Sequence, residues 1–145
     1  MRAPLIDAAR VGLSWAATAS FLAFSLVSGV HAADPPPPRV SELLAQPLAN
    51  VPGKEAMMLT VEYPPGGADP IHRHNASAFV YVIDGTVEMQ LEGGKKVTLQ
   101  PGQTFYEDPS SVHLVGRNAS DTKPAKFVVF LVKEPGAPAL VPVER

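Results

Sequence analysis

The segment "GGADPIHRHNASAFVYVIDG", from Gly66 to Gly85, contains two histidines one residue apart, directly before a run of strand-forming residues. Side chains at positions i and i+2 of a strand project to the same face, so His72 and His74 point in one direction, about 7 Å apart along the chain. A bend in the strand would let both imidazoles reach one ion. The segment therefore predicts a β-strand that carries half of a metal site.

Short runs rich in Val, Tyr, Phe and Thr continue after this segment, and turn residues separate them. The Asp84-Gly85 pair is a strong hairpin signal, because glycine adopts positive φ without penalty. No alternation of helices with strands is visible, which disfavours a parallel sheet. The pattern predicts an all-β fold, an antiparallel sandwich or barrel. The predicted strands are 56–63, 78–84, 86–92, 96–99, 103–107, 112–117 and 126–132.

The beginning of the chain has the features of a secretory signal peptide. Arg2 and Arg10 precede an apolar run, residues 11–30, and the small residues Val30 and Ala32 stand where a signal peptidase reads. We predict cleavage after Ala32, so that 1–32 is the signal and the mature protein is periplasmic or secreted. A retained anchor helix is the alternative, since about 20 apolar residues can span a bilayer.

The remaining chain divides into a Pro-rich leader and edge segment (33–53), a β-barrel domain (54–134) and a C-terminal tail (135–145). "DPPPP" at 34–38 predicts a stiff polyproline II spacer. In the segment that follows, Ser41 can cap a short helix that ends before Pro47. A short helix or strand that packs on the domain edge is the simpler alternative. We expect the tail to lie along the surface or to pair at a sheet edge.

Composition excludes several classes of function. Of 12 basic and 14 acidic side chains, Arg2, Arg10 and Asp7 leave with the signal, so ten and thirteen remain, a net charge of −3. This mild charge argues against nucleic acid as a partner, and against a polybasic membrane patch once the signal is removed. The chain has no cysteine. A metal would therefore be held by nitrogen and oxygen alone. An exported, cysteine-free, alanine-rich chain looks bacterial.

The mature chain keeps three histidines, because His31 leaves with the signal. His113 lies on a later predicted strand and could reach His72 and His74 across a barrel interior. Three neutral imidazoles suit zinc, iron, copper or nickel, and three histidines with one open position are a known catalytic zinc arrangement. The alternative is that a His-x-His pair arises by chance on an exposed strand.

At these residues the sequence resembles the cupin superfamily. The first cupin motif is a glycine, five residues, His-x-His, a glutamate three or four residues on and a glycine six further; here Gly66, His72, His74 and Gly85 fit. Ala78 stands where the family has its glutamate. The second motif is looser. "LQPGQTFYEDPSSVHLVGRN" (99–118) contains the Pro-Gly turn, a strand and His113, but Asp-Pro-Ser replaces the usual Pro-x-Gly.

The resemblance implies a small jelly-roll barrel, often dimeric, with a divalent metal (Fe, Mn, Zn, Ni or Cu) near its mouth and a small molecule as ligand or substrate. By motif match, His72, His74 and His113 would be the ligands. Glu107 and Gln90 are the polar residues that could lean inward from neighbouring strands, as supports of the ligands or, for Glu107, as a direct ligand. A barrel without metal that binds a ligand in an apolar interior is the alternative.

Two functions follow as hypotheses. The first is an exported single-domain cupin whose metal supports oxygenase or isomerase chemistry on a small anionic or enolic molecule. The second is a non-enzymatic module of the cell envelope that binds or senses a small molecule or metal. Aromatic residues alternate along two predicted strands, a pattern typical first of a core or an interface and second of a substrate pocket. These aromatic residues are Phe79, Tyr81, Phe105 and Tyr106. A homodimer is expected.

Overall fold

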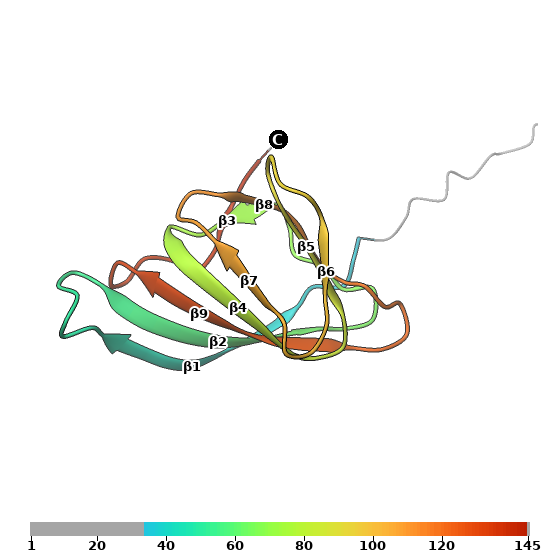
Figure 1. Cartoon of the computed structure of the whole chain (residues 1–145), viewed down its shortest axis with the longest axis horizontal. Helices are drawn as coiled ribbons and strands as arrows, with labels where there is room; N and C mark the ends of the chain where they lie inside the picture. The colour runs from blue at the N-terminus through green and yellow to red at the C-terminus, as the bar shows by residue number, and fades with distance from the viewer. Residues whose placement is uncertain (1–33, 145) are drawn as a thin grey trace, which may run out of the picture. The chain divides into compact units, whose positions relative to one another are not determined.

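The computed structural model describes residues 34–144, and the predicted signal peptide lies outside them. The described chain is a succession of strands (Figure 1). Within it there is no helix long and apolar enough to cross a membrane. The strands are β1 (Arg39–Pro47), β2 (Glu55–Tyr63), β3 (His72–Arg73), β4 (Ala76–Asp84), β5 (Val87–Leu91), β6 (Val97–Leu99), β7 (Thr104–Glu107), β8 (Val112–Asn118), β9 (Ala125–Lys133) and β10 (Val141–Pro142).

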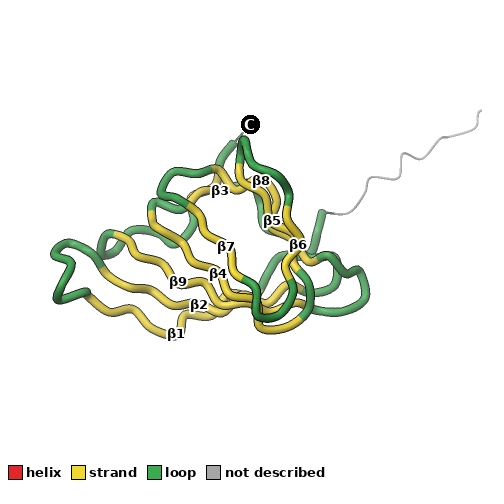
Figure 2. Tube along the Cα trace, in the orientation of Figure 1, coloured by secondary structure: helices red, strands yellow, loops and turns green. Residues whose placement is uncertain are grey.

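Two antiparallel sheets of five strands each build the domain (Figure 2). The first sheet has the order β1-β2-β9-β4-β7, and the second has the order β10-β3-β8-β5-β6. Strands far apart in sequence lie side by side in both, as in the pairing of β2 with β9. The all-β jelly-roll predicted from the sequence is confirmed, and so is every strand that it placed.

The hairpin predicted at Asp84-Gly85 is wrong. The two strands on either side of this turn belong to different sheets: β4 pairs with β7 and β9, whereas β5 pairs with β6 and β8. Gly85 has φ of 73°, and a Cβ atom there would lie 2.5 Å from the carbonyl oxygen of Pro124. The glycine is therefore required for a tight crossing between the sheets, not for a hairpin.

The short helix predicted after Ser41 is also wrong. Residues 39–47 form β1, an edge strand of the first sheet, and Ser41 pairs with Thr60 of β2. All nine residues of β1 are exposed. Helix propensity and a capping serine are weak local signals, and cross-strand hydrogen bonds to β2 override them here.

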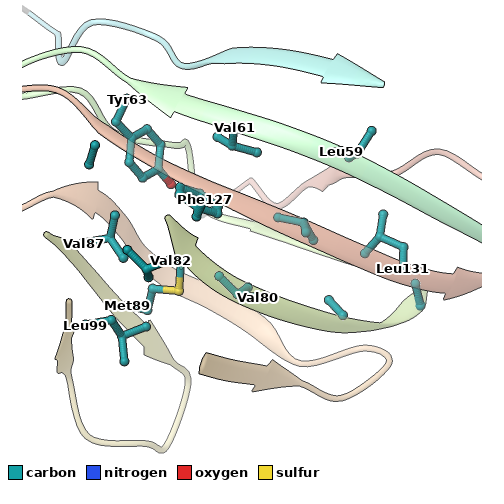
Figure 3. Close-up of a cluster of buried hydrophobic side chains, with 14 residues drawn as sticks. Leu59, Val61, Tyr63, Val80, Val82, Val87, Met89, Leu99, Phe127 and Leu131 are labelled. Atoms are coloured by element: carbon teal, nitrogen blue, oxygen red, sulfur yellow. The ribbon is translucent and has the colours of Figure 1, made fainter. Parts of the chain in front are cut away.

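The hydrophobic core lies between the sheets and follows strand alternation. Inward residues of β9 are buried at every second position, and the residues between them are half-buried. Tyr63 and Phe127 pack with ring centroids 5.1 Å apart. Figure 3 shows Val82, Val87 and Met89 gathered in one part of this core. The buried apolar cluster comprises Leu59, Val61, Tyr63, Ala76, Ala78, Val80, Val82, Val87, Met89, Leu99, Ala125, Phe127, Val129 and Leu131.

The C-terminal tail pairs with the second sheet, one of the two positions expected for it. Val141 and Pro142 form β10 beside β3. Upstream of β10, the ammonium of buried Lys133 donates hydrogen bonds to the Glu55 carboxylate and, at 2.7 Å, to the Ala137 carbonyl oxygen. These contacts fix the tail segment that passes over the histidines.

Candidate metal centre

Four inward-facing side chains from three parts of the chain meet at one end of the interior. His72 lies in β3 and pairs directly across from His113 of β8. His74 follows β3 and also points inward, so the two members of the His-x-His pair share a face as expected. Glu107 is the last residue of β7 in the first sheet. The two sheets thus contribute together to one buried cluster of His72, His74, Glu107 and His113, the His₃Glu cluster.

The position of Glu107 explains the missing glutamate of the cupin motif. Ala78, which stands at that motif position, is fully buried and pairs directly with Glu107 across the β4–β7 ladder. Directly opposed residues of an antiparallel pair have Cβ atoms about 4.5–5.5 Å apart and point to the same face. A carboxylate on β7 therefore reaches the space that a longer side chain at Ala78 would fill.

The distances within the His₃Glu cluster suit one ion. Nε2 of His72 lies 3.2 Å from Nε2 of His74. A Glu107 carboxylate oxygen lies 3.6 Å from Nε2 of His74 and 3.4 Å from Nδ1 of His113. All four candidate ligand atoms are within 4.8 Å of one another. With metal–ligand bonds of about 2.1 Å, neighbouring ligand atoms are separated by about 3.0–3.4 Å.

Backbone hydrogen bonds set the tautomers of two histidines. Nδ1–H of His72 donates to the Pro70 carbonyl at 2.9 Å, and Nδ1–H of His74 donates to the Ala139 carbonyl. Each Nε2 atom therefore carries a lone pair, and the two Nε2 atoms face each other. Two acceptors at this distance repel unless a cation lies between them. This is the arrangement by which proteins orient metal-ligating imidazoles.

Burial controls the protonation of the cluster in the absence of a cation. Burial, together with the nearby charge of Asp69, raises the pKa of Glu107 to about 7. Burial, together with the other two imidazoles, lowers the pKa of His113 to about 3. Burial also lowers the pKa values of His72 and His74. Three neutral imidazoles beside one carboxyl group form a ligand set ready for a divalent cation.

The cluster contains polar atoms without a hydrogen-bond partner. Among the described residues these buried side-chain atoms are one carboxylate oxygen of Glu107 and both ring nitrogens of His113. Leaving a buried polar group unpaired costs about 1–3 kcal/mol, and more for a charged one. A metal ion bound to Glu107 and His113 would remove this cost. On this ground the residues present fit a divalent transition metal.

A small cavity of about 90 Å³ adjoins the His₃Glu cluster. Its other walls are mainly apolar, but Tyr63 and Asp69 also line it. The Tyr63 hydroxyl donates to an Asp69 carboxylate oxygen at 2.5 Å. A Cβ atom at Gly116 would lie 3.0 Å from that hydroxyl and 3.2 Å from a ring carbon of His113. The lack of a side chain at Gly116 therefore allows β8 to approach this hydrogen-bonded pair.

Gln90 lies outside the cluster, contrary to the sequence expectation. Met89 faces the core, so strand alternation turns Gln90 to the outer face of β5, where its amide donates to the Gly94 carbonyl at 3.1 Å. Sequence reasoning placed Glu107 near the cluster but missed Asp69, Tyr63 and the Ala139 carbonyl. The strand periodicity of β2 marked Tyr63 as inward, whereas no local pattern marked Asp69 or Ala139, because both lie outside the strands.

The comparisons with known proteins agree with this geometry. A family model described as a cupin domain matches residues 59–131. No curated protein sequence matches the chain. A conserved Klebsiella pneumoniae protein with a double-stranded β-helix domain is 21% identical, with a TM-score of 0.59, and the match covers 79% of this chain and 91% of that one.

Two enzymes are also structurally similar over part of their length. An oxalate oxidase is 26% identical with a TM-score of 0.55, over 73% of this chain and 55% of that chain. The DMSP lyase DddQ from Ruegeria pomeroyi DSS-3 is 23% identical with a TM-score of 0.53, over 61% of this chain and 43% of that chain. The chain thus matches only about half the length of either enzyme.

Proposed function

Because this chain belongs to the cupin superfamily, we propose that it holds a divalent transition metal in the His₃Glu cluster and uses it to act on a small molecule. One observation supports this above all others. Two histidine Nε2 lone pairs and an unpaired Glu107 oxygen converge inside the protein, where no water-exposed surface compensates them. The ligands would be His72, His74, Glu107 and His113.

The ligand set constrains the metal. Three nitrogens and one oxygen suit Fe, Mn, Ni, Cu or Zn. Four protein ligands complete a tetrahedral zinc site, whereas an ion that prefers six ligands keeps two positions for water or substrate. When bound, such an ion supplies Lewis acidity or redox chemistry. We propose oxygenase or isomerase chemistry on this basis.

The surrounding residues orient the cluster and form the walls of the cavity beside it. The Pro70 and Ala139 carbonyls fix the His72 and His74 tautomers, so each ring presents Nε2. Glu107 balances one positive charge when ionised. Leu140 and Val40 line the same cavity as the histidines and give it apolar walls. Tyr63 keeps its proton toward Asp69, which leaves the hydroxyl oxygen free to accept a hydrogen bond from a ligand.

The cavity restricts the substrate to a few heavy atoms. A volume of about 90 Å³ is well below the roughly 300–1,000 Å³ of drug-sized pockets. The oxalate oxidase that this chain resembles has been solved with the small carboxylate glycolate. We therefore propose a small anionic or enolic molecule, with O₂ or water as the second reactant.

The small cavity also supports a second candidate function. If the ion is zinc, the four side chains fill its coordination shell and leave no position for a substrate. The protein would then be a non-enzymatic module that binds a metal or small molecule in the cell envelope. The two candidates differ in whether the bound ion has an exchangeable water.

Metal analysis of the natively purified protein tests the proposed function. We expect close to one equivalent of a single transition metal, measured by inductively coupled plasma mass spectrometry. The identity of that metal then separates the candidates: an ion that prefers six ligands keeps exchangeable water and supports the enzyme, whereas zinc supports the binding module. Glu88→Gln, which removes a carboxylate from the outer face of β5, is the control and should keep its metal. A metal-free native protein that also fails to bind Fe, Mn, Ni, Cu or Zn would contradict the enzyme and a metal-binding module, and would leave only a module that binds a small molecule without metal.

We further propose that the protein is exported and acts as a homodimer. The basic start, apolar run and small-residue exit before Ala33 support export to the periplasm or medium. Intact mass of the protein from its native host tests this, since loss of residues 1–32 is expected and an uncleaved chain would contradict it. The dimer surface is argued next.

A further inference from the structure

The outer faces of the two sheets differ in chemistry. On the second sheet, Glu88 accepts hydrogen bonds from Arg117 at 2.7 Å and Lys96 at 3.1 Å, as expected for a face in water. On the first sheet, Phe79, Tyr81 and Tyr106 are exposed by 47%, 51% and 45% of their surface. Large aromatic side chains left half in water are unusual on a monomer.

Phe79 and Tyr106 belong to a continuous row across all five strands of the first sheet, and Tyr81 lies in the adjacent row of the same face, opposite Val128. Direct cross-strand pairs connect Leu44 to Met58, Met58 to Phe130, Phe130 to Phe79 and Phe79 to Tyr106. The Phe79 and Tyr106 rings are 5.0 Å apart, and the Phe79 and Phe130 rings are 6.3 Å apart. The row, called the outer apolar row, thus crosses the sheet from one edge strand to the other.

We propose that the face bearing the outer apolar row is the interface between two copies of this chain. This inference rests on the homodimer of the proposed function and is independent of the metal. Phe79, Tyr81 and Tyr106, each about half exposed, present roughly 300 Å² of mainly apolar surface, taking about 200 Å² for a whole aromatic side chain. Leu44 and the half-buried Met58, Phe130, Val128 and Val132 add to this area, toward the roughly 800 Å² per partner in a standard interface.

Charge on this face favours a second copy over a lipid surface. Two rows away from the outer apolar row, the same face carries a row of charged residues. Lys126 of this row donates to Glu62 at 2.6 Å and lies opposite Asp84, so these charges are paired with one another. With Arg39, which pairs with Glu62 across β1 and β2, this row carries two acids and two bases. Anionic membranes attract clusters of Lys and Arg instead. A face that is nearly neutral and internally paired can meet its own copy without repulsion between like charges.

The order of residues in the row suits a two-fold axis. An axis parallel to the strands above Phe130 reverses the cross-strand order, so Leu44 would lie over Tyr106 of the partner subunit and Met58 over the partner's Phe79. The aliphatic half of each row then packs on the aromatic half of the other. Contacts of methionine sulfur and aliphatic groups with aromatic rings are favourable. Two sheets stacked in this way lie about 10 Å apart, as in sandwich cores.

Analytical ultracentrifugation of the full mature protein tests the interface. We expect a dimer at tens of micromolar, with Phe79→Lys weakening association at least ~30-fold. Thr98→Lys, which adds the same charge to the outer face of β6, is the matched control and should stay dimeric. Metal content measured on the same samples should not change, which separates this inference from the metal proposal. A monomeric wild type, bound to vesicles or not, overturns the inference, and so does a dimer that survives Phe79→Lys combined with Tyr106→Lys.

Disulfide crosslinking tests the axis, because the chain has no cysteine of its own. Leu44→Cys and Tyr106→Cys proteins are mixed and oxidised. We expect a covalent heterodimer of the two variants, since the proposed two-fold axis brings these positions together across the interface. Thr98→Cys mixed with either variant gives the background level. A Leu44–Tyr106 heterodimer yield no higher than that background contradicts the proposed face-to-face arrangement.

Discussion

At one end of the interior the inward side chains are Val82, Val87 and Met89, and at the other end they are three histidines and a glutamate. One strand can contribute to both ends of the interior. Along β4, Val82 at the apolar end and Ala78 at the polar end are four residues apart, roughly 13 Å by strand rise. The apolar end is filled by its own side chains. At the polar end, Ala76 and Ala78 are small, and the space beside them is occupied by imidazoles and a carboxylate.

The comparison shows what a metal centre requires of a small barrel. The apolar end stabilises the fold by removing side chains from water, at about 25 cal/mol per Å². The polar end gives up that contribution and leaves Glu107 and His113 with unpaired atoms. The same backbone thus provides stability at one end and an ion-binding site at the other. The following predictions test this division, from the largest expected effect to the smallest.

Removal of His113 should have the largest effect. His113→Ala takes one ligand from the cluster and removes the nearer of the two imidazoles beside the Glu107 carboxylate oxygen. We expect metal affinity to fall by roughly 10²–10³-fold, given about 10–16 kcal/mol shared among four ligands. Titration monitored by calorimetry measures this. Unchanged affinity in His113→Ala would mean that the polar end does not bind metal through this residue.

Truncation at the apolar end should affect stability and leave metal affinity intact. Met89 is 1% exposed, and Met89→Ala creates a cavity that should cost about 2–4 kcal/mol in the free energy of unfolding. Urea denaturation of the metal-free protein measures the loss. Thr98→Ala on the outer face is the control and should stay within about 0.5 kcal/mol. A Met89→Ala variant that loses metal affinity would show that the two ends are coupled.

Moving the carboxylate from Glu107 of β7 to the directly paired Ala78 of β4 should test whether this carboxylate contributes to metal binding. We expect Glu107→Ala to weaken metal binding roughly 100-fold, the lower end of the range expected when one of four ligands is lost. Because Ala78 lies directly opposite, adding Ala78→Glu to Glu107→Ala should restore much of the affinity. Calorimetry on the single and double variants measures both steps. No recovery in the double variant, if it folds with wild-type circular dichroism, would contradict this exchange.

Metal affinity should depend on pH through Glu107. Burial raises the pKa of Glu107 to about 7, so below that value the ion must displace a proton from it. Affinity should rise about tenfold per pH unit up to about pH 7 and flatten above it. Burial lowers the pKa of His113 to about 3 and also lowers the pKa values of His72 and His74, so the histidines compete for protons less than free imidazoles would. Affinity that stays constant as the pH is lowered from 7 to about 5.5 would contradict this role of Glu107.

The smallest effect concerns the turn that leads into β8. Ser110 has φ of 75°, a left-handed conformation that favours glycine, and its amide donates to the His74 carbonyl at 3.1 Å. Ser110→Gly should therefore stabilise the protein by about 0.5–1 kcal/mol. Thermal denaturation of the metal-free protein measures it. A loss of stability would indicate that the serine side chain contributes more than the backbone strain costs.

Local sequence patterns predicted the strands and three of the four members of the cluster as ligands. Alternation within a strand is a property of neighbouring residues, so it placed His72 and His74 on one face without knowledge of the fold. The fixed spacing of the histidines to Gly66 and Gly85 identified the cupin resemblance. Composition alone excluded thiolate ligands, because the chain contains no cysteine.

Only the tertiary structure decided which residues complete the site. The pairing of Ala78 with Glu107 depends on the register of two strands more than 20 positions apart, and no local preference sets that register. The same holds for the Ala139 carbonyl beside His74, for the crossing at Gly85 and for the strand at residues 39–47. Long-range hydrogen bonds and packing fix these features, since they gain their free energy only when distant segments meet.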